Sequence, residues 1–266
     1  GETYVLNLID TPGHVDFSYE VSRAIASCEG ALLVVDATQG IQAQTISNLY
    51  LAIGNDLEII PVLNKIDVES AMIDEVKDQI IDLIGCKEED ILLASGKTGL
   101  GVENVLEAIV ERIPAPEGDE TGDLQILVSS IDYNDYVGRI GIGRIERGVI
   151  RKNQDVYVCN YHSGEAPKRA KVVALFQIDG LNRVPVDTAK VGDIVCFSGA
   201  ESITIGDTVT SLNAPEPLEF VKVSEPTLEM TFSVNTSPFA GKEGKFVTSR
   251  QLRDRLYREL LKDVSL

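Results

Sequence analysis

Short apolar runs alternate with amphipathic helical patterns over residues 4–112. Runs typical of buried strands cover residues 4–10, 31–36, 59–63 and 91–94. Helical patterns lie between and after these runs, at about residues 16–27, 42–53, 73–84 and 102–112. This alternation predicts an α/β fold, in which helices cover both faces of a parallel sheet. Ligands of such sheets bind at the carboxyl ends of the strands, so the residues directly after each strand are the first candidates for a site.

The pattern changes after residue 114, where a hydrophilic stretch rich in Pro and Gly predicts a linker. Beyond it, strand-like runs follow one another without helices between them, at residues 124–132, 139–146, 155–159, 170–176 and 194–197. Turn residues separate these runs. The pattern predicts a small antiparallel β-barrel or sandwich.

A second Pro-containing break near residue 215 precedes one more predicted strand, residues 227–234, and a helix that begins near Ser249. We therefore predict four segments: a partial α/β domain at 1–114, a linker at 115–123, a β-barrel at 124–213, and the start of an α+β domain at 214–266.

Charge is distributed unevenly between these segments. The chain has 24 Lys and Arg residues against 42 Asp and Glu, a formal net charge of -18. Residues 1–119 hold 6 basic and 22 acidic residues, whereas residues 120–266 hold 18 and 20. An evenly acidic chain would be a poor ligand for nucleic acid, because affinity for phosphates depends on Lys and Arg. The asymmetry removes that objection for the second part and favours two modules.

Other features of the composition exclude some classes of protein. No apolar run approaches the length of a membrane span, about 18 residues, and no secretory signal is visible at the start of the printed sequence. Cys28, Cys86, Cys159 and Cys196 lie far apart and form no C-x-x-C pair. We expect reduced thiols in a cytoplasmic protein, and neither a disulfide framework nor a zinc site. We expect His162, in a polar loop, to be solvated.

The sequence DTPGH at residues 10–14 directly follows the first predicted strand. Asp10 at a strand end can hold a water bound to Mg²⁺, because magnesium prefers oxygen ligands and keeps part of its hydration shell. Gly13 allows a backbone N–H to approach a terminal phosphate. His14 can then orient an attacking water. Alone, this sequence is equally typical of an ordinary turn.

Two further segments follow the third and fourth predicted strands. NKID occupies residues 64–67, and SGK occupies residues 95–97. Asp67 can accept two hydrogen bonds from the N1–H and exocyclic amine of guanine, a donor pair that adenine lacks. Asn64 can join the loop to its neighbours, and the stem of Lys65 can cover the face of the base. We expect backbone N–H groups in the second segment to face the guanine O6; its residues are Ser95, Gly96 and Lys97.

NKID alone also occurs where a helix begins, and SGK alone is weak evidence that gains weight only from its context. DTPG and NKID together, each directly after a predicted strand and in this order, favour a guanine-nucleotide site.

With these motifs the chain resembles the translational GTPases. Residues 1–114 are similar to the LepA (elongation factor 4) family, notably in LNLIDTPGHVDFSYE at residues 6–20 and QAQT at residues 42–45. Residues 115–266 resemble the TypA/BipA family, in DYNDYVGRI at residues 132–140 and in NTSPFAGKEGKFVTSR at residues 235–250. A divergent natural homologue, a recombinant and an assembly artefact all fit this mosaic.

The resemblance implies GTP hydrolysis to GDP and phosphate on the ribosome, in the cytoplasm, with Mg²⁺ as the metal ion. Ribosomal RNA and proteins are the implied partners, and no DNA is expected. The resemblance assigns the catalytic role to His14, the magnesium side to Asp10 and the γ-phosphate contact to Gly13. The guanine-recognition residues that it implies are Asn64, Lys65, Asp67, Ser95, Gly96 and Lys97. Gly96 stands where most GTPases have Ala, and this keeps the backbone N–H.

One expected element is absent from the printed sequence. A GTPase needs G-x-x-x-x-G-K-[S/T] to hold the phosphates, and no such segment occurs in residues 1–266. We therefore expect a partial P-loop-type domain, without its phosphate loop and first strand, in a chain truncated at both ends. We also expect very weak GTP binding and no hydrolysis by these residues alone. A ribosome- or RNA-binding fragment without enzymatic activity is the alternative function.

The last part of the chain is locally basic. Residues 239–262 hold seven basic residues against three acidic ones. They are typical of a solvated helix face with i, i+4 ion pairs, and equally of a surface that contacts ribosomal RNA phosphates. The predicted RNA contacts are Lys242, Lys245, Arg250 and Arg253.

Overall fold

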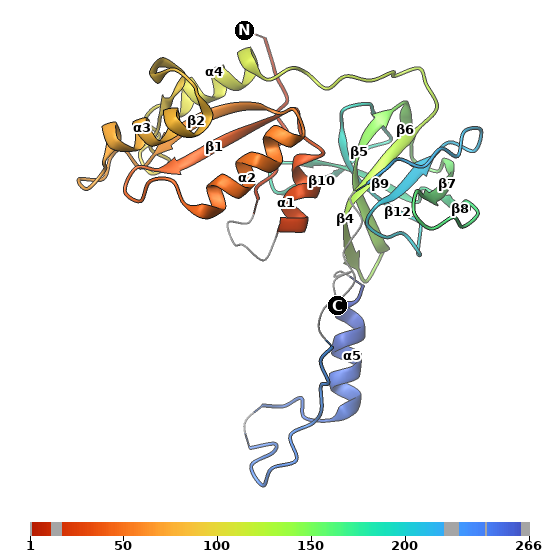
Figure 1. The fold of residues 1–266 in the computed structure, drawn as a ribbon. Coiled ribbons are helices and arrows are strands. Elements are labelled where there is room, and N and C mark those ends of the chain that lie inside the picture. Colours follow the sequence, from red (N-terminus) through yellow and green to blue (C-terminus); the bar gives the residue numbers. More distant parts are fainter. Residues whose placement is uncertain (1, 12–17, 221–228, 243, 262–266) are drawn as a thin grey trace. The chain divides into compact units, whose positions relative to one another are not determined.

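The computed structural model describes residues 2–11, 18–220, 229–242 and 244–261 (Figure 1). The chain divides into two compact units, Gly1–Pro116 and Glu117–Leu266. Each unit has its own sheet and its own core, and each is described by itself below. Among the described residues, no helix combines the length and the apolar character required to cross a membrane.

The first unit contains a parallel three-stranded sheet in the order β1-β2-β3. Strands β1 and β2 run in register from the pair Gly30 and Glu58 to the pair Asp36 and Asn64, so Asp36 and Asn64 lie side by side at the carboxyl ends. The elements of the unit are α1 (Ser18–Ile25), β1 (Gly30–Asp36), α2 (Ala43–Gly54), β2 (Glu58–Asn64), α3 (Ile73–Ile84), the 3-10 helix η2 (Glu88–Asp90), β3 (Leu92–Leu93) and α4 (Val102–Arg112).

Helices cover both faces of this sheet, as the pattern predicts. On one face, the sheet packs against α2 and α3 in a core that includes Val35, Leu63 and Ile80. On the other face, Ile60 and Val62 pack against α4. Side chains of β2 alternate between the two cores because successive residues of a strand point to opposite faces. The four predicted helices and three of the predicted strands are confirmed.

The strand predicted at residues 4–10 is wrong. Residues 2–11 adopt no regular structure, and Val5 and Leu8 are 86% and 85% exposed. A strand requires a hydrogen-bonded neighbour, and these residues pair with none of the described strands. Their apolar side chains consequently remain in solvent, although the sequence pattern alone is that of a buried strand.

The second unit is built on an antiparallel sheet in the order β10-β9-β12-β5-β4-β13-β7-β8, with a separate pair, β11-β6. Its strands are β4 (Gln125–Asn134), β5 (Gly138–Arg147), β6 (Val149–Arg151), β7 (Asp155–Asn160), β8 (Lys168–Lys171), β9 (Ala174–Asp179), β10 (Asn182–Pro185), β11 (Thr188–Lys190), β12 (Ile194–Ser198) and β13 (Asp207–Thr210).

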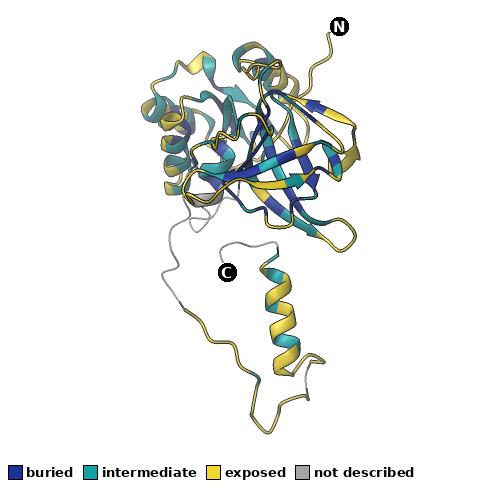
Figure 2. Cartoon of the chain, turned by 90° about the vertical axis from the view of Figure 1, so that its right-hand side faces the viewer, coloured by how far each residue is buried: buried dark blue, intermediate teal, exposed yellow. Residues whose placement is uncertain are grey.

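The second sheet is not a closed barrel, which corrects the prediction for residues 124–213. Among the described strands, β10 and β8 have a hydrogen-bonded neighbour on one side only. Both are short and highly exposed, and carry charged residues or Pro, features that disfavour further pairing. The sheet nevertheless encloses one core, to which Ile126, Ile145 and Phe197 contribute, and buried positions follow its strands in Figure 2. The predicted β domain is therefore present as an open sheet.

Two other predicted strands differ in the structure. The run at residues 170–176 is divided between β8 and β9, because the N–H groups of Val172 and Val173 donate to Gln154 and Ser198 on different segments. The run at residues 227–234 forms no strand over its described part, residues 229–234, where Phe232 is exposed. As at residues 4–10, no described strand pairs with it.

The predicted C-terminal helix is confirmed as α5 (Ser249–Glu259). Thr248 caps it: its hydroxyl accepts a hydrogen bond from the Gln251 N–H, and the Gln251 side chain accepts from the Thr248 N–H. All four cysteines are free in the structure, and Cys159 and Cys196 are buried. That residues 214–266 begin an α+β domain stays a prediction.

Candidate functional site

The NKID and SGK segments lie at the same edge of the first sheet. Asn64 ends β2, and Ser95 follows β3 by two residues. The two strands are parallel neighbours, with Leu63 opposite Leu93, so the loops that follow them leave the sheet together. The order of the elements thus brings segments about 30 residues apart to one place, as expected for a ligand site in an α/β fold.

Asn64 joins the two loops directly. Its side-chain Oδ1 accepts hydrogen bonds from the N–H of Lys65 at 2.8 Å and from the N–H of Gly96 at 3.0 Å. One side chain thereby sets the separation of the loops. A Cβ atom at Gly96 would lie 3.9 Å from the nearest Asn64 atom, so this position also has room for the Ala that is more usual in GTPases.

Asp67 and Ser95 make the second connection. The buried Ser95 hydroxyl donates to Asp67 Oδ1 at 2.6 Å and accepts from the Thr98 N–H at 3.1 Å. Asp67 is itself exposed, and its other oxygen, Oδ2, has no partner among the described residues. The carboxylate is therefore held in place on one side and available to a ligand on the other.

Only one backbone N–H of the SGK segment remains available to a ligand. The Ser95 N–H donates to the carbonyl of Leu100 at 2.8 Å, and the Gly96 N–H donates to Asn64. Within the described structure this leaves the Lys97 N–H without an acceptor. Two exposed residues, Asp67 with its unpartnered Oδ2 and Lys97 with its unpartnered N–H, thus lie on neighbouring loops.

Lys65 extends toward β1. Its backbone has φ 64°, in the left-handed region, and its Nζ lies 2.6 Å from Asp36 Oδ2. Asp36 Oδ1 accepts from the Thr38 N–H at 2.8 Å and from the Thr38 hydroxyl at 2.7 Å. Burial alone would raise the pKa of the Asp36 carboxyl, but the hydrogen bonds from Lys65 and Thr38 stabilise its ionised form, so its pKa is lowered. Sequence analysis missed Asp36, although an acid that ends a predicted strand was a usable signal.

The residues predicted for the phosphate side are only partly described. Asp10 is exposed and lies in the irregular segment 2–11. Gly13 and His14 lie outside the described residues. The roles predicted for these three residues therefore stay predictions.

The described residues also limit how a magnesium ion can be held. They contain no group of three or more His, Cys, Asp and Glu residues placed to ligate a metal. A single exposed carboxylate such as Asp10 fits the outer-shell role, in which it accepts a hydrogen bond from a metal-bound water.

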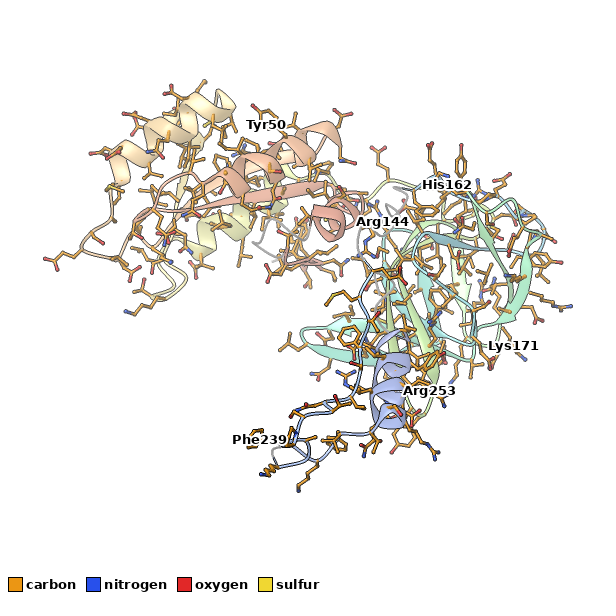
Figure 3. All side chains as sticks on the ribbon, turned by 60° about the horizontal axis from the view of Figure 1, so that its bottom comes forward. Tyr50, Arg144, His162, Lys171, Phe239 and Arg253 are labelled. Atoms are coloured by element: carbon orange, nitrogen blue, oxygen red, sulfur yellow. The ribbon has the colours of Figure 1, made fainter. Side chains whose placement is uncertain are left out.

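The four basic residues predicted to contact RNA are all exposed. Lys242 and Lys245 lie in the loop before α5, and Arg250 and Arg253 lie on the helix. Figure 3 shows Arg253 on the helix and Phe239 on the preceding loop. Lys242 Nζ lies 4.7 Å from the centre of the Phe239 ring, a cation–π contact. Arg250 Nε also lies 3.9 Å from Asp254 Oδ2, four residues further along the helix. This exposed pair therefore agrees equally with the alternative interpretation, a solvated helix face with i, i+4 ion pairs.

His162 is exposed, but it is more than a solvated side chain. Its ring meets Phe220 edge-on, with centroids 4.8 Å apart, and its Nε2 lies 3.0 Å from the Phe220 carbonyl oxygen. The residue holds the segment after β13 against the β7–β8 loop. Sequence spacing carries no signal for this contact, because 58 residues separate the partners.

Family models match most of the chain. Residues 1–115 match the elongation factor Tu GTP binding domain, and residues 138–210 match elongation factor Tu domain 2. The chain belongs to the translational GTPases. Both matches follow the division into units, since one ends and the other begins on either side of the boundary after Pro116.

Several curated proteins that are similar to this chain are named elongation factor 4. Those of Phocaeicola vulgatus, Flavobacterium johnsoniae and Parabacteroides distasonis are 56%, 54% and 53% identical to it over 216, 219 and 217 residues. Each alignment covers 81% of this chain and 36% of the relative, so the chain spans little more than a third of their length. The first unit ends at Pro116, so the similarity continues well into the second unit. The resemblance of residues 115–266 to TypA/BipA is not tested by these relatives and stays a prediction.

Proposed function

We propose that this chain is part of a ribosome-associated translation factor that hydrolyses GTP, and that it supplies the guanine-recognition end of the nucleotide site. The observation that carries the proposal is the pair of loops after β2 and β3. Two side-chain hydrogen bonds, Gly96 to Asn64 and Ser95 to Asp67, fix one loop against the other. Two loops fixed against each other, one with a carboxylate oxygen and the other with an N–H that has no partner among the described residues, suit a flat polar ligand.

The exposed groups suit guanine in particular. The Asp67 carboxylate accepts the N1–H and the exocyclic amine of guanine, while the Lys97 N–H donates to O6. Adenine presents a lone pair at N1 and an amine in place of O6, so both contacts become repulsive or unpaired. The chemistry of the two groups therefore discriminates between the bases, and the Ser95 hydroxyl keeps the carboxylate in the orientation that this requires.

The remaining roles concern the phosphate end of the site. We propose that His14 orients the attacking water, that the backbone N–H of Gly13 contacts the γ-phosphate, and that Asp10 accepts a hydrogen bond from a water on Mg²⁺. When bound, Mg²⁺ would neutralise charge on the phosphates. The printed sequence contains no phosphate loop, so we expect these residues alone to bind GTP more weakly than micromolar and not to hydrolyse it.

Base preference tests the proposal without requiring hydrolysis. We would titrate the ¹⁵N-labelled chain with GDP and with ADP at millimolar concentration and follow backbone amides by NMR. Amides of residues 64–67 and 95–97 are expected to shift more with GDP than with ADP. Asp67→Ala should remove this difference, whereas Glu69→Ala, which removes an exposed carboxylate two residues away, should preserve it. Equal shifts with both nucleotides would contradict guanine recognition, and micromolar or tighter GTP binding would contradict the predicted weak affinity.

A second candidate function is ribosome or RNA binding without catalysis, in the cytoplasm. The exposed cations Lys242, Lys245, Arg250 and Arg253 favour it, since polyanion binding depends on such groups. Reversing the charge of Lys242 and Lys245 to Glu should weaken co-sedimentation with ribosomes and reduce its salt dependence. Lys87→Glu, one such charge reversal at an exposed position of the first unit, is the control and carries half the charge change of the double variant. Unchanged co-sedimentation of the double variant would count against this surface.

A further inference from the structure

Asp36 is a charged residue at the edge of the candidate site to which sequence reasoning assigned no role. It ends β1, directly beside Asn64 in the sheet register. Its two carboxylate oxygens have different partners: Oδ1 accepts two hydrogen bonds from Thr38, and Oδ2 lies 2.6 Å from Lys65 Nζ. The carboxylate is thus immobilised by Thr38 and presents a single oxygen to the ammonium group.

The partner of Asp36 is restrained at both ends. The left-handed backbone of Lys65 sets the direction in which its side chain leaves the loop, and the ion pair holds the far end of that side chain. Between the two, the four methylenes cross from the end of β2 toward the end of β1. The polar groups available to a base are Asp67, in the loop after β2, and the Lys97 N–H, in the loop after β3. Strand β3 lies on the side of β2 opposite to β1.

We propose that Asp36 is a positioning residue of the guanine site: it holds the Lys65 side chain so that the methylenes form a fixed apolar wall against the face of the base. The inference rests on the proposed guanine binding. A free lysine side chain loses rotamer freedom when a ligand packs on it, whereas the ion pair has already removed that freedom in the unliganded protein. Asp36 therefore favours nucleotide binding although it does not touch the base.

A purely structural role explains the pair less well. Strands β1 and β2 are already joined by a ladder that runs their full length, and the Ala37 N–H donates to the Asn64 carbonyl just beyond it. The Lys65 side chain is 53% exposed, and ion pairs at such positions contribute little to stability. Loss of the pair should therefore change nucleotide binding more than it changes unfolding.

The test uses the whole chain and variants that remove only this contact. Asp36→Asn keeps an oxygen for Thr38 but replaces the acceptor of Lys65 by an amide. Lys65→Met keeps an unbranched apolar side chain but removes the ammonium group, so it breaks the same ion pair from the lysine side. It provides the test if Asp36→Asn does not fold. Glu58→Gln is the matched control, because it breaks a comparable ion pair, with Arg112 at 3.2 Å, at the opposite end of β2.

Dissociation constants for GDP and ADP would be measured by NMR titration, with the thermal midpoint of each variant. We expect Asp36→Asn and Lys65→Met each to weaken GDP binding by on the order of 5-fold, through freed side-chain entropy, with unchanged thermal midpoints. The double variant should be no weaker than either single variant, because both remove the same contact. Lys65→Ala should weaken binding further than Lys65→Met, since it removes the wall itself. Glu58→Gln should leave binding unchanged.

Two failures are distinguishable. If the unmodified chain binds GDP and ADP equally, guanine recognition fails, and the positioning role of Asp36 is overturned with it. If the unmodified chain prefers GDP and both single variants bind GDP as tightly as it does, the positioning role alone is overturned. Additive losses in the double variant would also overturn it, because they would show that Asp36 and Lys65 act separately.

Discussion

The two units use side-chain hydrogen bonds for different purposes. In the first unit, Asn64, Asp67 and Asp36 connect loops at the carboxyl edge of a parallel sheet, and among the described residues Asp67 Oδ2 and the Lys97 N–H remain without a partner. In the second unit, comparable bonds lie between strands: Asn160 bonds to Asp207, and Arg183 lies 2.8 Å from Asp132. In this chain, polar groups at loop ends build the candidate site, whereas polar groups between strands hold the second sheet together. Four substitutions test this contrast.

The largest expected effect is in the core of the second unit. Ile145, on β5, is fully buried and packs in a core to which most strands of the second unit contribute residues. Ile145→Ala should lower the free energy of unfolding of this unit by about 2–5 kcal/mol, through lost burial and a residual cavity. Urea unfolding with amide exchange resolved to the strands measures it. Ile178→Ala, at a 47% exposed position, is the control and should cost much less. If Ile145→Ala cost no more stability than Ile178→Ala, the assignment of Ile145 to the packed core would be contradicted.

Gly101→Ala tests whether the loops of the first unit depend on close backbone packing. Gly101 has φ 74°, and a Cβ atom there would lie 1.9 Å from the carbonyl oxygen of Leu93. Strain and clash should cost about 1–3 kcal/mol and displace the SGK loop from Asn64. Faster amide exchange at residues 95–100 would record the effect. Exchange equal to that of the unmodified chain would show that the loop does not depend on this contact.

Asp207 tests the second unit by pH. Burial raises the pKa of Asp207, although hydrogen bonds from Asn160 and Thr204 stabilise its ionised form. The folded state therefore holds the proton at pH values where the unfolded state, with a pKa of about 3.9, has lost it. The stabilisation is complete below the unfolded pKa and is lost as pH rises through the folded pKa, so the stability of this unit should fall over that interval.

Urea midpoints measured across the acidic range would show this slope. Asp207→Asn should remove its contribution, because an amide does not titrate. Asp135→Asn, at an exposed turn position, provides the comparison and should leave the slope as it is. A slope that persists unchanged in Asp207→Asn would assign the pH dependence to other groups.

Gly96→Ala carries the smallest expected effect. Its Cβ would meet nothing nearer than Asn64 at 3.9 Å, and the N–H that donates to Asn64 is retained. Stability should change by less than about 0.5 kcal/mol, as at other unstrained surface positions. Thermal unfolding and GDP titration check it. A large loss of GDP binding would show that nucleotide binding requires Gly at this position, although the unliganded structure has room for a Cβ atom.

The elements that sequence analysis predicted well are those whose signal is local. Helices α2, α3 and α4 follow apolar residues at helical spacing, and β1 and β2 are apolar runs bounded by polar residues. The errors at residues 4–10 and 229–234 have one cause. An apolar run indicates that a segment can be buried, but whether it forms a strand depends on a neighbouring strand that is often far away in sequence.

Sequence patterns alone reveal the order of strands and helices, the guanine-type motifs and their place at strand ends, and the separation of an acidic from a nearly neutral part. Which atoms of those motifs stay free follows from the packing of the folded chain. The Gly96 N–H donates to Asn64, and the Ser95 hydroxyl donates to one oxygen of Asp67. The Lys65 ammonium group donates to Asp36 on the neighbouring strand. These pairings join residues about 30 positions apart, and only the side-by-side pairing of parallel strands in the sheet brings such residues within hydrogen-bond distance.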